Sequence, residues 1–322
     1  RDRRTRPRSA LARPGRPRVG VLGLGIMGGA IARNLAAAGF AVAGHDPDAA
    51  RVAALADAGL RRCDGAAALA ASVDVLLSSL PGEAALEASV AAVVTARLHD
   101  ARRAAAPAGV AAAATLDWIE LSTLSIAAKQ RARERLATAG VTMLDAPVSG
   151  TGAQAVQRDL VVYASGDLAA WQRCRAVIDG FARAQHHVGE FGHGMRLKLV
   201  ANLLVAVHNV ATAEALGLAS RAGLDPAQSL ELLAGGAAAS RILSLRGPLM
   251  VRDQYLPPTM KLDVWQKDLA LIEAFARGHG AATPLFDATL PLYAAAVRAG
   301  LGSQDTAAVF RILQEMTPDA AT

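Results

Sequence analysis

The stretch RVGVLGLGIMGGAIARNL, residues 18–35, decides the fold of the N-terminal half of this chain. A short apolar strand leads into a G-x-G-x-x-G motif, and an Ala-rich helical pattern follows. In this motif the first glycine permits a tight turn, the second lets a pyrophosphate approach the backbone, and the third lets strand and helix pack closely. The helix N-terminus then offers its N–H groups to the phosphates. The stretch predicts a dinucleotide site formed by Gly23, Gly25, Ile26, Met27 and Gly28.

The second expected strand, AVAGHD at 41–46, ends in Asp46, 21 residues after Gly25. A carboxylate at this distance accepts hydrogen bonds from the ribose 2′-hydroxyl of NAD and repels the 2′-phosphate of NADP. We therefore expect NAD in preference to NADP. Two alternatives stay open: Asp46 could be a plain N-cap of a helix beginning at Pro47, and Arg51 is close enough in sequence to pair with a 2′-phosphate.

Strand and helix patterns divide the chain into two parts. Apolar strands separated by Ala- and Leu-rich helices continue to about residue 190, which is typical of a mostly parallel sheet covered on both faces. Helical patterns alone follow Gly192. We expect an α/β Rossmann-type dinucleotide-binding domain at 18–189, then an all-α domain at 190–322 built on a long interdomain helix. The expected strands lie within 18–25, 41–46, 73–80, 117–123, 142–148 and 160–166; the expected helix breaks are 222–226, 246–250, 256–259, 282–284 and 299–303.

Charge is unevenly distributed along the 322 residues, whose formal net charge is +6. Residues 1–18 hold eight Arg and one Asp, so the rest of the chain carries about −1 and has no basic excess for nucleic acid. Residues 1–17 lack hydrophobic periodicity, and we expect a disordered basic tail. A targeting peptide and a Pro- and Arg-rich extension are both compatible with it, and we prefer the extension.

Cys63 and Cys174 are far apart and outside any C-x-x-C or His-rich cluster, which indicates neither a disulfide framework nor a zinc site. The seven His show no ligand spacing with carboxylates or Cys, so we expect no metal. The sequence has no run of about 20 uncharged apolar residues. We expect a soluble cytoplasmic protein without a membrane segment.

The stretch GHGMRLKLVANLLVAVHNVATAEAL, 192–216, predicts a helix that is apolar except for one stripe. Lys198, Asn202, Asn209 and Thr212 share that stripe. Burying unpaired amides and an ammonium would cost several kcal/mol, so the stripe fits a helix facing a cleft. The alternative is that Lys198 reaches solvent while Asn202 and Asn209 are satisfied core amides.

Four motifs follow one another along the chain: GLGIMGGAIARNL (23–35), LDAPVSGTGAQA (144–155), GHGMRLKLVAN (192–202) and KDLALI (267–272). With these motifs in order, the chain resembles the β-hydroxyacid dehydrogenases, which include 3-hydroxyisobutyrate dehydrogenase, tartronate semialdehyde reductase and relatives of 6-phosphogluconate dehydrogenase. Together they span nearly everything from 18 to 317. The resemblance implies an oxidoreductase that transfers a hydride between NAD(P) and a small 3-hydroxy acid, of the 3-hydroxyisobutyrate or glycerate/tartronate semialdehyde type.

The resemblance also implies roles for individual residues. Lys198 matches the family's general acid/base, and Asn202 matches the asparagine that orients substrate and lysine. Thr151 stands where the family usually has a second glycine, which narrows the pocket or adds a hydroxyl. The remaining matches are Ser149, Gly150 and Thr151 at the substrate carboxylate, Ser122 at the substrate and Thr123 at the cofactor in the Ser-Thr element, Leu80 and Pro81 lining the cofactor, and Lys267 at the cofactor cleft.

Plainer interpretations remain beside these roles. Residues 149–152 suit an ordinary strand-to-helix turn, and Lys267 with Asp268 suits a solvated helix face. For acid/base work the pKa of Lys198 must fall below about 10.4, and we expect desolvation, Lys267 and the helix N-terminus to lower it. The competing functions are an imine reductase on the same scaffold, whose members generally lack the lysine, and a non-catalytic NAD-binding assembly module. We expect a small-molecule substrate and a homodimer or homotetramer.

Overall fold

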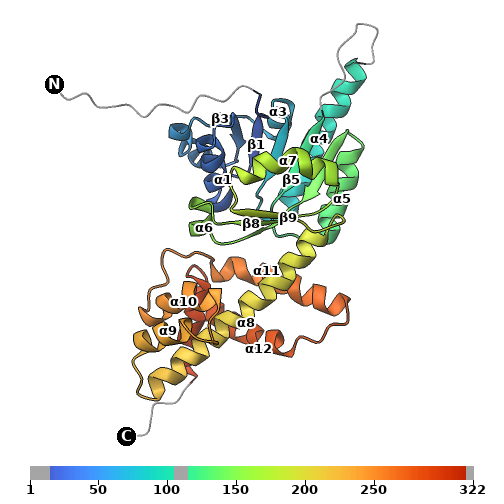
Figure 1. The fold of residues 1–322 in the computed structure, drawn as a ribbon. Coiled ribbons are helices and arrows are strands. Elements are labelled where there is room, and N and C mark those ends of the chain that lie inside the picture. The colour runs from blue at the N-terminus through green and yellow to red at the C-terminus, as the bar shows by residue number, and fades with distance from the viewer. Residues whose placement is uncertain (1–14, 105–114, 317–322) are drawn as a thin grey trace, which may run out of the picture. The chain divides into compact units, whose positions relative to one another are not determined.

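The computed structural model describes residues 15–104 and 115–316, which form two compact units, Arg1–Lys198 and Leu199–Thr322 (Figure 1). Most of the expected disordered tail lies outside the described residues. The predicted domain boundary at 189/190 precedes α8 (His193–Arg221), which belongs to the first unit up to Lys198 and to the second from Leu199.

A six-stranded parallel sheet forms the centre of the first unit, in the order β3-β2-β1-β4-β5-β6. The order reverses between β1 and β4, and this switch point is where open α/β sheets bind ligands at the carboxyl ends of their strands. The strands are β1 (Val19–Leu22), β2 (Val42–His45), β3 (Arg61–Arg62), β4 (Val75–Ser78), β5 (Leu116–Glu120) and β6 (Val141–Asp145).

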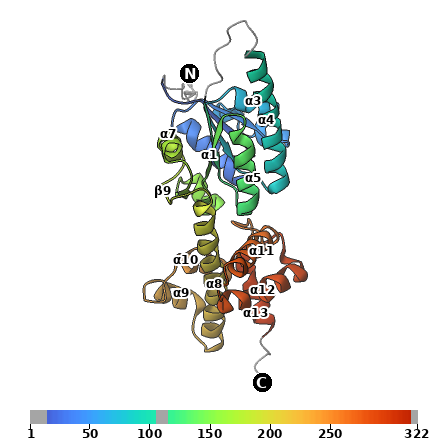
Figure 2. The same ribbon diagram turned by 90° about the vertical axis from the view of Figure 1, so that its right-hand side faces the viewer.

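Helices cover both faces of this sheet, as Figure 2 shows. One core lies under α1 (Ile26–Ala37) and α7 (Leu168–Asp179), and the other under α3 (Ala66–Ala71), α4 (Glu83–Ala104) and α5 (Ile126–Ala137). Successive strand residues point to opposite faces, so Val21 enters the first core and Leu22 the second. Burial on both sides explains the near-continuous apolar strands, and the predicted α/β class is confirmed.

The strand expected at 160–166 is present, but it lies outside the six-stranded sheet. It is β8 (Val161–Ala164), which pairs with β7 (Val148–Ser149) and β9 (Ala184–His187) in a three-stranded sheet. The sixth strand of the main sheet is instead β3, made of two exposed arginines. Neither β3 nor β9, whose sequence is AQHH, has the apolar pattern that reveals a strand.

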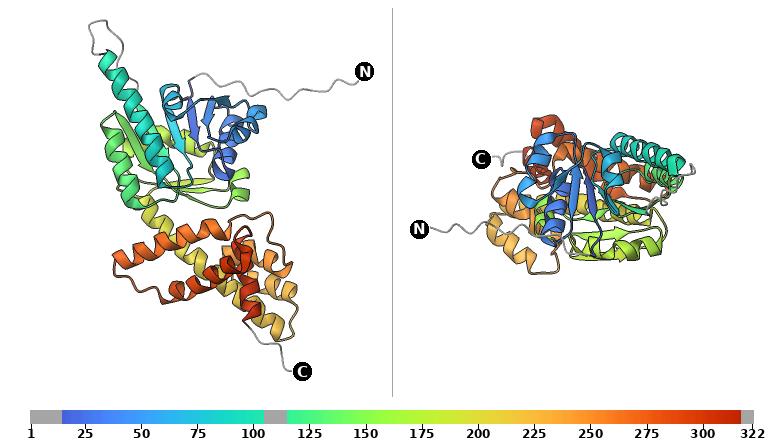
Figure 3. Two further views of the ribbon diagram at one scale, coloured as in Figure 1. Left: turned by 180° about the vertical axis from the view of Figure 1, so that it is seen from behind. Right: turned by 90° about the horizontal axis from the view of Figure 1, so that it is seen from above.

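The second unit is helical, as predicted, and its helices are labelled in Figures 1 and 2 and seen from behind in Figure 3. Asn209 of α8 donates hydrogen bonds to the Tyr293 hydroxyl and to the Thr306 carbonyl, each at 3.0 Å. The helices after α8 are α9 (Pro226–Ala234), α10 (Arg241–Val251), α11 (Leu262–Gly278), α12 (Pro284–Ala296) and α13 (Val309–Glu315).

One expected helix break is wrong. Residues 246–250 lie inside α10, which continues through Pro248. A proline in a helix removes one hydrogen bond and usually kinks or ends the helix. Here tertiary contacts compensate, because Gly247 packs directly against Leu230 of α9 and Arg246 is paired with buried Asp305.

Among the described helices, α8 alone is long and apolar enough to cross a membrane, by length and composition only. The core helices of proteins also meet this criterion of length and composition. Asn209 of α8 is fully buried, and its amide donates hydrogen bonds to groups of its own unit. These contacts are those of a core helix.

Candidate active site

The glycine turn has the geometry that its sequence predicts. Gly23 has a φ of +82°, a conformation that favours glycine, and a Cβ there would overlap the carbonyl oxygen of Ser79. A Cβ on Gly28 would overlap the carbonyl oxygen of Gly23. These two contacts press β1, the turn and α1 together at the switch point of the sheet.

The N-terminus of α1 fits a pyrophosphate. Its N-cap is Gly25, which contributes no side-chain hydrogen bond, whereas Asp48, Ser125 and Asp167 each cap the helix that follows them. The first N–H groups of a helix have no partner within the helix and attract anions. Ile26 is exposed here and Met27 is half-buried. The uncapped turn therefore suits the diphosphate of a dinucleotide.

Asp46 is buried, and both its carboxylate oxygens accept backbone hydrogen bonds, Oδ2 from Leu24 at 2.7 Å and Oδ1 from Asp48 at 2.9 Å. Burial alone would raise the pKa of Asp46, but these bonds and nearby Arg51 outweigh it and lower the pKa. The N-cap alternative is wrong for this residue, because α2 (Ala49–Ala53) begins later and is capped by Asp48. Asp46 therefore holds the glycine turn against the end of β2.

Arg51 brings an exposed positive charge to the same place. Its Nη1 lies 3.4 Å from Asp46 Oδ2, its Nε lies 3.4 Å from Asp48 Oδ2, and its side chain is 53% exposed. A Cβ on Gly25 would lie 3.8 Å from the same Nη1. A carboxylate and a guanidinium thus stand together beside the glycine turn.

Hydrogen bonds join the ends of β4 and β5. The Leu80 N–H donates to Ser122 Oγ at 2.8 Å, and the Ser122 N–H donates to Glu120 Oε1 at 2.7 Å. Glu120 is fully buried and also accepts a hydrogen bond from the Ser78 hydroxyl. The predicted pair Leu80 and Ser122 is therefore brought together, with Pro81 exposed and Thr123 half-buried beside it. Glu120 was missed, although an acid inside an apolar strand was a signal for it.

The loop at Ser149–Thr151 meets the glycine turn. A Cβ on Gly152 would overlap Ile26, so the loop and the turn are in direct contact. Thr151 is the N-cap of α6 (Gly152–Val156) in a capping box: its hydroxyl accepts from Gln154 N, and its own N–H donates to Gln154 Oε1 at 3.0 Å. The interpretation of this segment as a strand-to-helix turn thus holds for Thr151, because its hydroxyl and N–H both bond to Gln154 in the first turn of α6.

The spacing G-x-G-x-x-x-K has a physical explanation at the start of α8. Gly192 has a φ of +95°, and a Cβ on Gly194 would overlap the Tyr163 carbonyl. The Gly194 N–H donates to Ser165 Oγ at 2.9 Å and the Met195 N–H to Asp145 Oδ2 at 2.8 Å. Half-buried Lys198 follows one turn later. The Asp145 carboxylate that holds this turn also accepts a hydrogen bond from the Lys129 ammonium at 2.8 Å.

In the second unit, Asn202 is buried and donates a hydrogen bond to Asp268 Oδ2 at 3.1 Å. Lys267 Nζ lies 3.6 Å from the other oxygen, Asp268 Oδ1. Asp268 thus joins two predicted residues, and because it is buried, the interpretation as a solvated helix face is wrong for Asp268. Farther along the stripe, Asn209 and Thr212 are core residues, since the Thr212 hydroxyl donates to the His208 carbonyl at 2.7 Å.

Within the described ranges no group of three or more His, Cys, Asp or Glu side chains could hold a metal ion. Both cysteines are buried, and burial raises the pKa of Cys174 to about 12.

Two family profiles match the chain. Residues 18–192 match the NAD binding domain of 6-phosphogluconate dehydrogenase, and residues 192–313 match the profile described as NAD-binding of NADP-dependent 3-hydroxyisobutyrate dehydrogenase. The chain belongs to the β-hydroxyacid dehydrogenase family. Membership in this family makes the first unit a nicotinamide dinucleotide-binding domain and confirms the resemblance seen in the four motifs.

Individual relatives agree with this family. An L-threonate dehydrogenase of Pectobacterium atrosepticum is 34% identical over 61% of this chain and 64% of its own length. Glyoxylate/succinic semialdehyde reductase 2 of Arabidopsis thaliana is 29% identical over 61% of this chain and 55% of its own length. The matched region thus spans less than two thirds of these curated relatives. A 3-hydroxyisobutyrate dehydrogenase structure from Salmonella typhimurium, 30% identical, covers 92% of this chain and 99% of its own, with a TM-score of 0.79.

Proposed function

We propose that this protein is an NAD(P)-dependent dehydrogenase that interconverts a small 3-hydroxy acid and its semialdehyde or keto form, with Lys198 as the acid/base. The observation that carries the proposal is the anchoring of the first turn of α8 just before Lys198, where Ser165 and Asp145 hold the Gly194 and Met195 N–H groups. Relatives named for L-threonate, succinic semialdehyde and 3-hydroxyisobutyrate support the substrate class.

Different residues bind the cofactor, bind the substrate and transfer the proton in this reaction. The bound nicotinamide supplies the hydride-transfer chemistry. The uncapped turn of α1 binds the diphosphate, and the Leu80 and Ser122 segments line the nicotinamide side. Ser149 and Gly150 bind the substrate carboxylate, while Thr151 shapes the loop as a cap. Lys198 accepts the proton of the substrate hydroxyl in oxidation and returns it in reduction, and Asn202, one turn farther along α8, orients the substrate.

Both NAD and NADP are compatible with the charges beside the glycine turn, and we propose NAD as the preferred cofactor. The Asp46 carboxylate is a negative charge, which disfavours a 2′-phosphate, and Arg51 is the group that would accommodate one. Both Asp46 oxygens already accept backbone hydrogen bonds. The preference for NAD over NADP therefore rests more on the negative charge of Asp46 than on a hydrogen bond from the ribose to this carboxylate. The expected preference is therefore moderate.

The test is turnover by the wild type and by Lys198→Ala, followed by reduced-nicotinamide absorbance, over small 3-hydroxy acids and semialdehydes with each cofactor. Loss of a general acid/base lowers the rate by about 10²–10⁴-fold, and cofactor binding should persist. Arg196→Ala is the matched control, because Arg196 is an exposed cation two residues away on the same helix. Equal activity of wild type and Lys198→Ala would overturn the assignment.

Two other functions give different outcomes. An imine reductase would turn over cyclic imines and ignore hydroxy acids, and a binding module would bind NAD tightly without turnover of either class. We favour the hydroxy-acid reaction over both because Lys198, Asn202 and Ser149 are all present.

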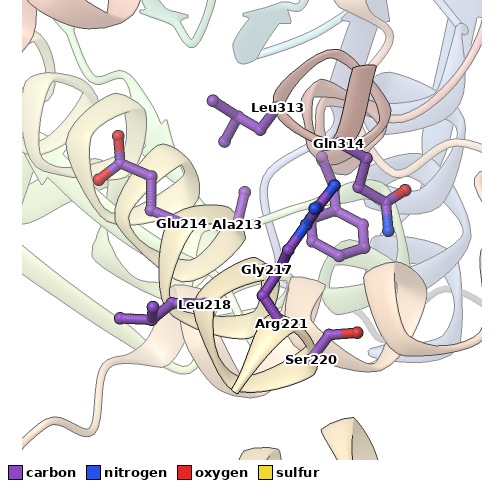
Figure 4. Close-up of a pocket in the computed structure, with 9 residues that line it drawn as sticks. Ala213, Glu214, Gly217, Leu218, Ser220, Arg221, Leu313 and Gln314 are labelled. Carbon is purple, nitrogen blue, oxygen red and sulfur yellow. The ribbon is translucent and has the colours of Figure 1, made fainter. Parts of the chain in front are cut away.

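We propose further that the protein is a cytoplasmic homodimer or homotetramer. Leu204 and Leu218 of α8 are 50% and 72% exposed, which is unusual for large apolar side chains on a core helix. Leu218 also lines a groove of about 510 Å³ that α8 and α13 form within the helical unit (Figure 4). Light scattering at several concentrations tests the assembly, and Leu218→Glu should lower the observed mass if this surface is the interface.

A further inference from the structure

Three chain segments that carry proposed site residues meet at one buried carboxylate. Asp145 ends β6, and its Oδ1 accepts a hydrogen bond from Lys129 Nζ of α5 at 2.8 Å. Its Oδ2 accepts from Met195 N of α8 at 2.8 Å and from Ser165 Oγ at 3.2 Å. Asp145, Lys129 and Ser165 are all fully buried. One side chain thus joins the end of β6, the helix after the Ser-Thr element, and the helix of Lys198.

We propose that Asp145 is a positioning residue for Lys198, with Lys129 fixing which of its oxygens faces α8. The inference rests on the proposed acid/base role of Lys198. The ammonium of Lys129 has three N–H donors and no acceptor, so it fixes Oδ1 and leaves Oδ2 for the first turn of α8. The first turn of α8 is held by this bond and by Ser165 Oγ to Gly194 N. A shift of this turn would move Lys198, which follows Gly194 by four residues.

Burial of the Lys129–Asp145 pair has a cost. Removing two charges from water is expensive, and apolar residues of similar volume are often equally stable in the same place. The distinctive property of this carboxylate is that it offers two anionic acceptor oxygens, one for Lys129 and one for α8. We therefore assign the pair to geometry at the active site.

Single and double variants test this role. In Asp145→Asn, the amide oxygen faces Lys129 and the amide NH₂ faces the Met195 N–H, so the first turn of α8 loses an acceptor. In Lys129→Met with Asp145→Asn, the oxygen is free to turn toward Met195. We expect kcat to fall about tenfold or more in the single variant and to return within about threefold of wild type in the double variant.

Asp117→Asn is the matched control. Asp117 is another buried strand carboxylate of the same unit, paired with Arg173 at 2.7 and 2.8 Å, and it lies near the amino end of β5. It should lose thermal stability and keep wild-type kcat at temperatures where the variant is fully folded. Cofactor dissociation constants should stay unchanged within about twofold in all variants, because the glycine turn is untouched.

Amide hydrogen exchange of Gly194 and Met195 provides a readout that does not depend on turnover. Faster exchange in Asp145→Asn, reversed in the double variant, supports the proposal even if wild type turns over no hydroxy acid. Wild-type kcat in folded Asp145→Asn overturns it, as does a double variant as slow as the single one. If Asp145→Asn does not fold, Ser165→Ala, which removes the Gly194 acceptor, must lower kcat for the proposal to survive.

Discussion

The Leu24 N–H donates a 2.7 Å hydrogen bond to the carboxylate of Asp46, which fastens the glycine turn to the end of the neighbouring strand. An asparagine has a single acceptor oxygen where the aspartate has two, and both aspartate oxygens accept backbone N–H groups. Asp46→Asn should therefore weaken NAD binding by about tenfold, as expected for one lost charged hydrogen bond, and weaken NADP binding less, because the change also removes the charge that repels the 2′-phosphate. Fluorescence titration with each cofactor measures this. A gain in NADP affinity would instead indicate that Asp46 acts mainly by repelling the 2′-phosphate.

Arg51 should discriminate between the cofactors. Its guanidinium is exposed beside Asp46 and Gly25, where a 2′-phosphate could pair with it. Arg51→Ala should raise the KM for NADP about tenfold, with the KM for NAD nearly unchanged, because an ion pair to phosphate is worth about 1.5–3 kcal/mol. Arg33→Ala is a suitable control, since Arg33 is a cation of α1 paired with exposed Asp57. Equal effects on both cofactors would rule out the assigned role.

Gly28→Ala should abolish tight cofactor binding. A methyl group at this position would overlap the carbonyl oxygen of Gly23 and push α1 away from β1. We expect an affinity loss of at least about tenfold, or about 1.4 kcal/mol. Calorimetric titration measures it, with Gly278→Ala as the control because no atom lies within 4 Å of a Cβ there. Unaltered binding by a folded Gly28→Ala protein would contradict the close packing.

Thr151→Val should affect stability more than substrate binding. The hydroxyl of Thr151 caps α6, so its removal should cost about 1 kcal/mol of folding free energy and leave the KM of the hydroxy acid within about twofold. Thr151→Ser retains the cap and should behave as wild type in both measurements. A tenfold rise of KM in the valine variant, with an unchanged melting temperature, would place the hydroxyl on the substrate.

Asp305 gives the helical unit a pH-dependent stability. Burial alone would raise its pKa, but Arg246, the Thr259 hydroxyl and the Ala307 N–H outweigh burial and lower it. A lowered folded pKa contributes stability that is complete above the unfolded value of about 3.9 and is lost as pH falls through the folded pKa. Asp305→Asn should therefore cost about 3 kcal/mol at neutral pH, because it leaves Arg246 buried and unpaired.

Thermal unfolding as a function of pH checks this last expectation. The difference between wild type and Asp305→Asn should shrink below the folded pKa of Asp305, where the wild-type carboxyl is protonated. Asp253→Asn is the control, because the pair of Asp253 with Arg311 is exposed and worth about 1 kcal/mol or less. A constant difference at all pH values would show that the charge of Asp305 contributes nothing.

Local pattern was sufficient for much of this protein. Gly23 and Gly28 could be placed on a tight turn because strand, glycines and helix follow one another within 18 residues, and short-range sterics determine that geometry. The alternation of apolar strands and helices determined the class of each unit for the same reason. Lys198 and Asn202 fell on one helical stripe, which depends only on the helical period.

Only the tertiary structure decided the partners of each polar group. Glu120 and Asp145 end strands and Asp46 follows one, yet the acids Asp46, Glu120 and Asp145 hold a glycine turn, a serine segment and a helix N-terminus, respectively. Their partners lie 22, 2 and 50 residues away in sequence, and no local pattern specifies a hydrogen bond across such varied distances. The strands β3 and β9 pair with β2 and β8 through backbone groups, which every sequence has. Their polar side chains therefore gave no sign of a strand. Sequence determined the kinds of element, and long-range hydrogen bonding determined how their ends form a site.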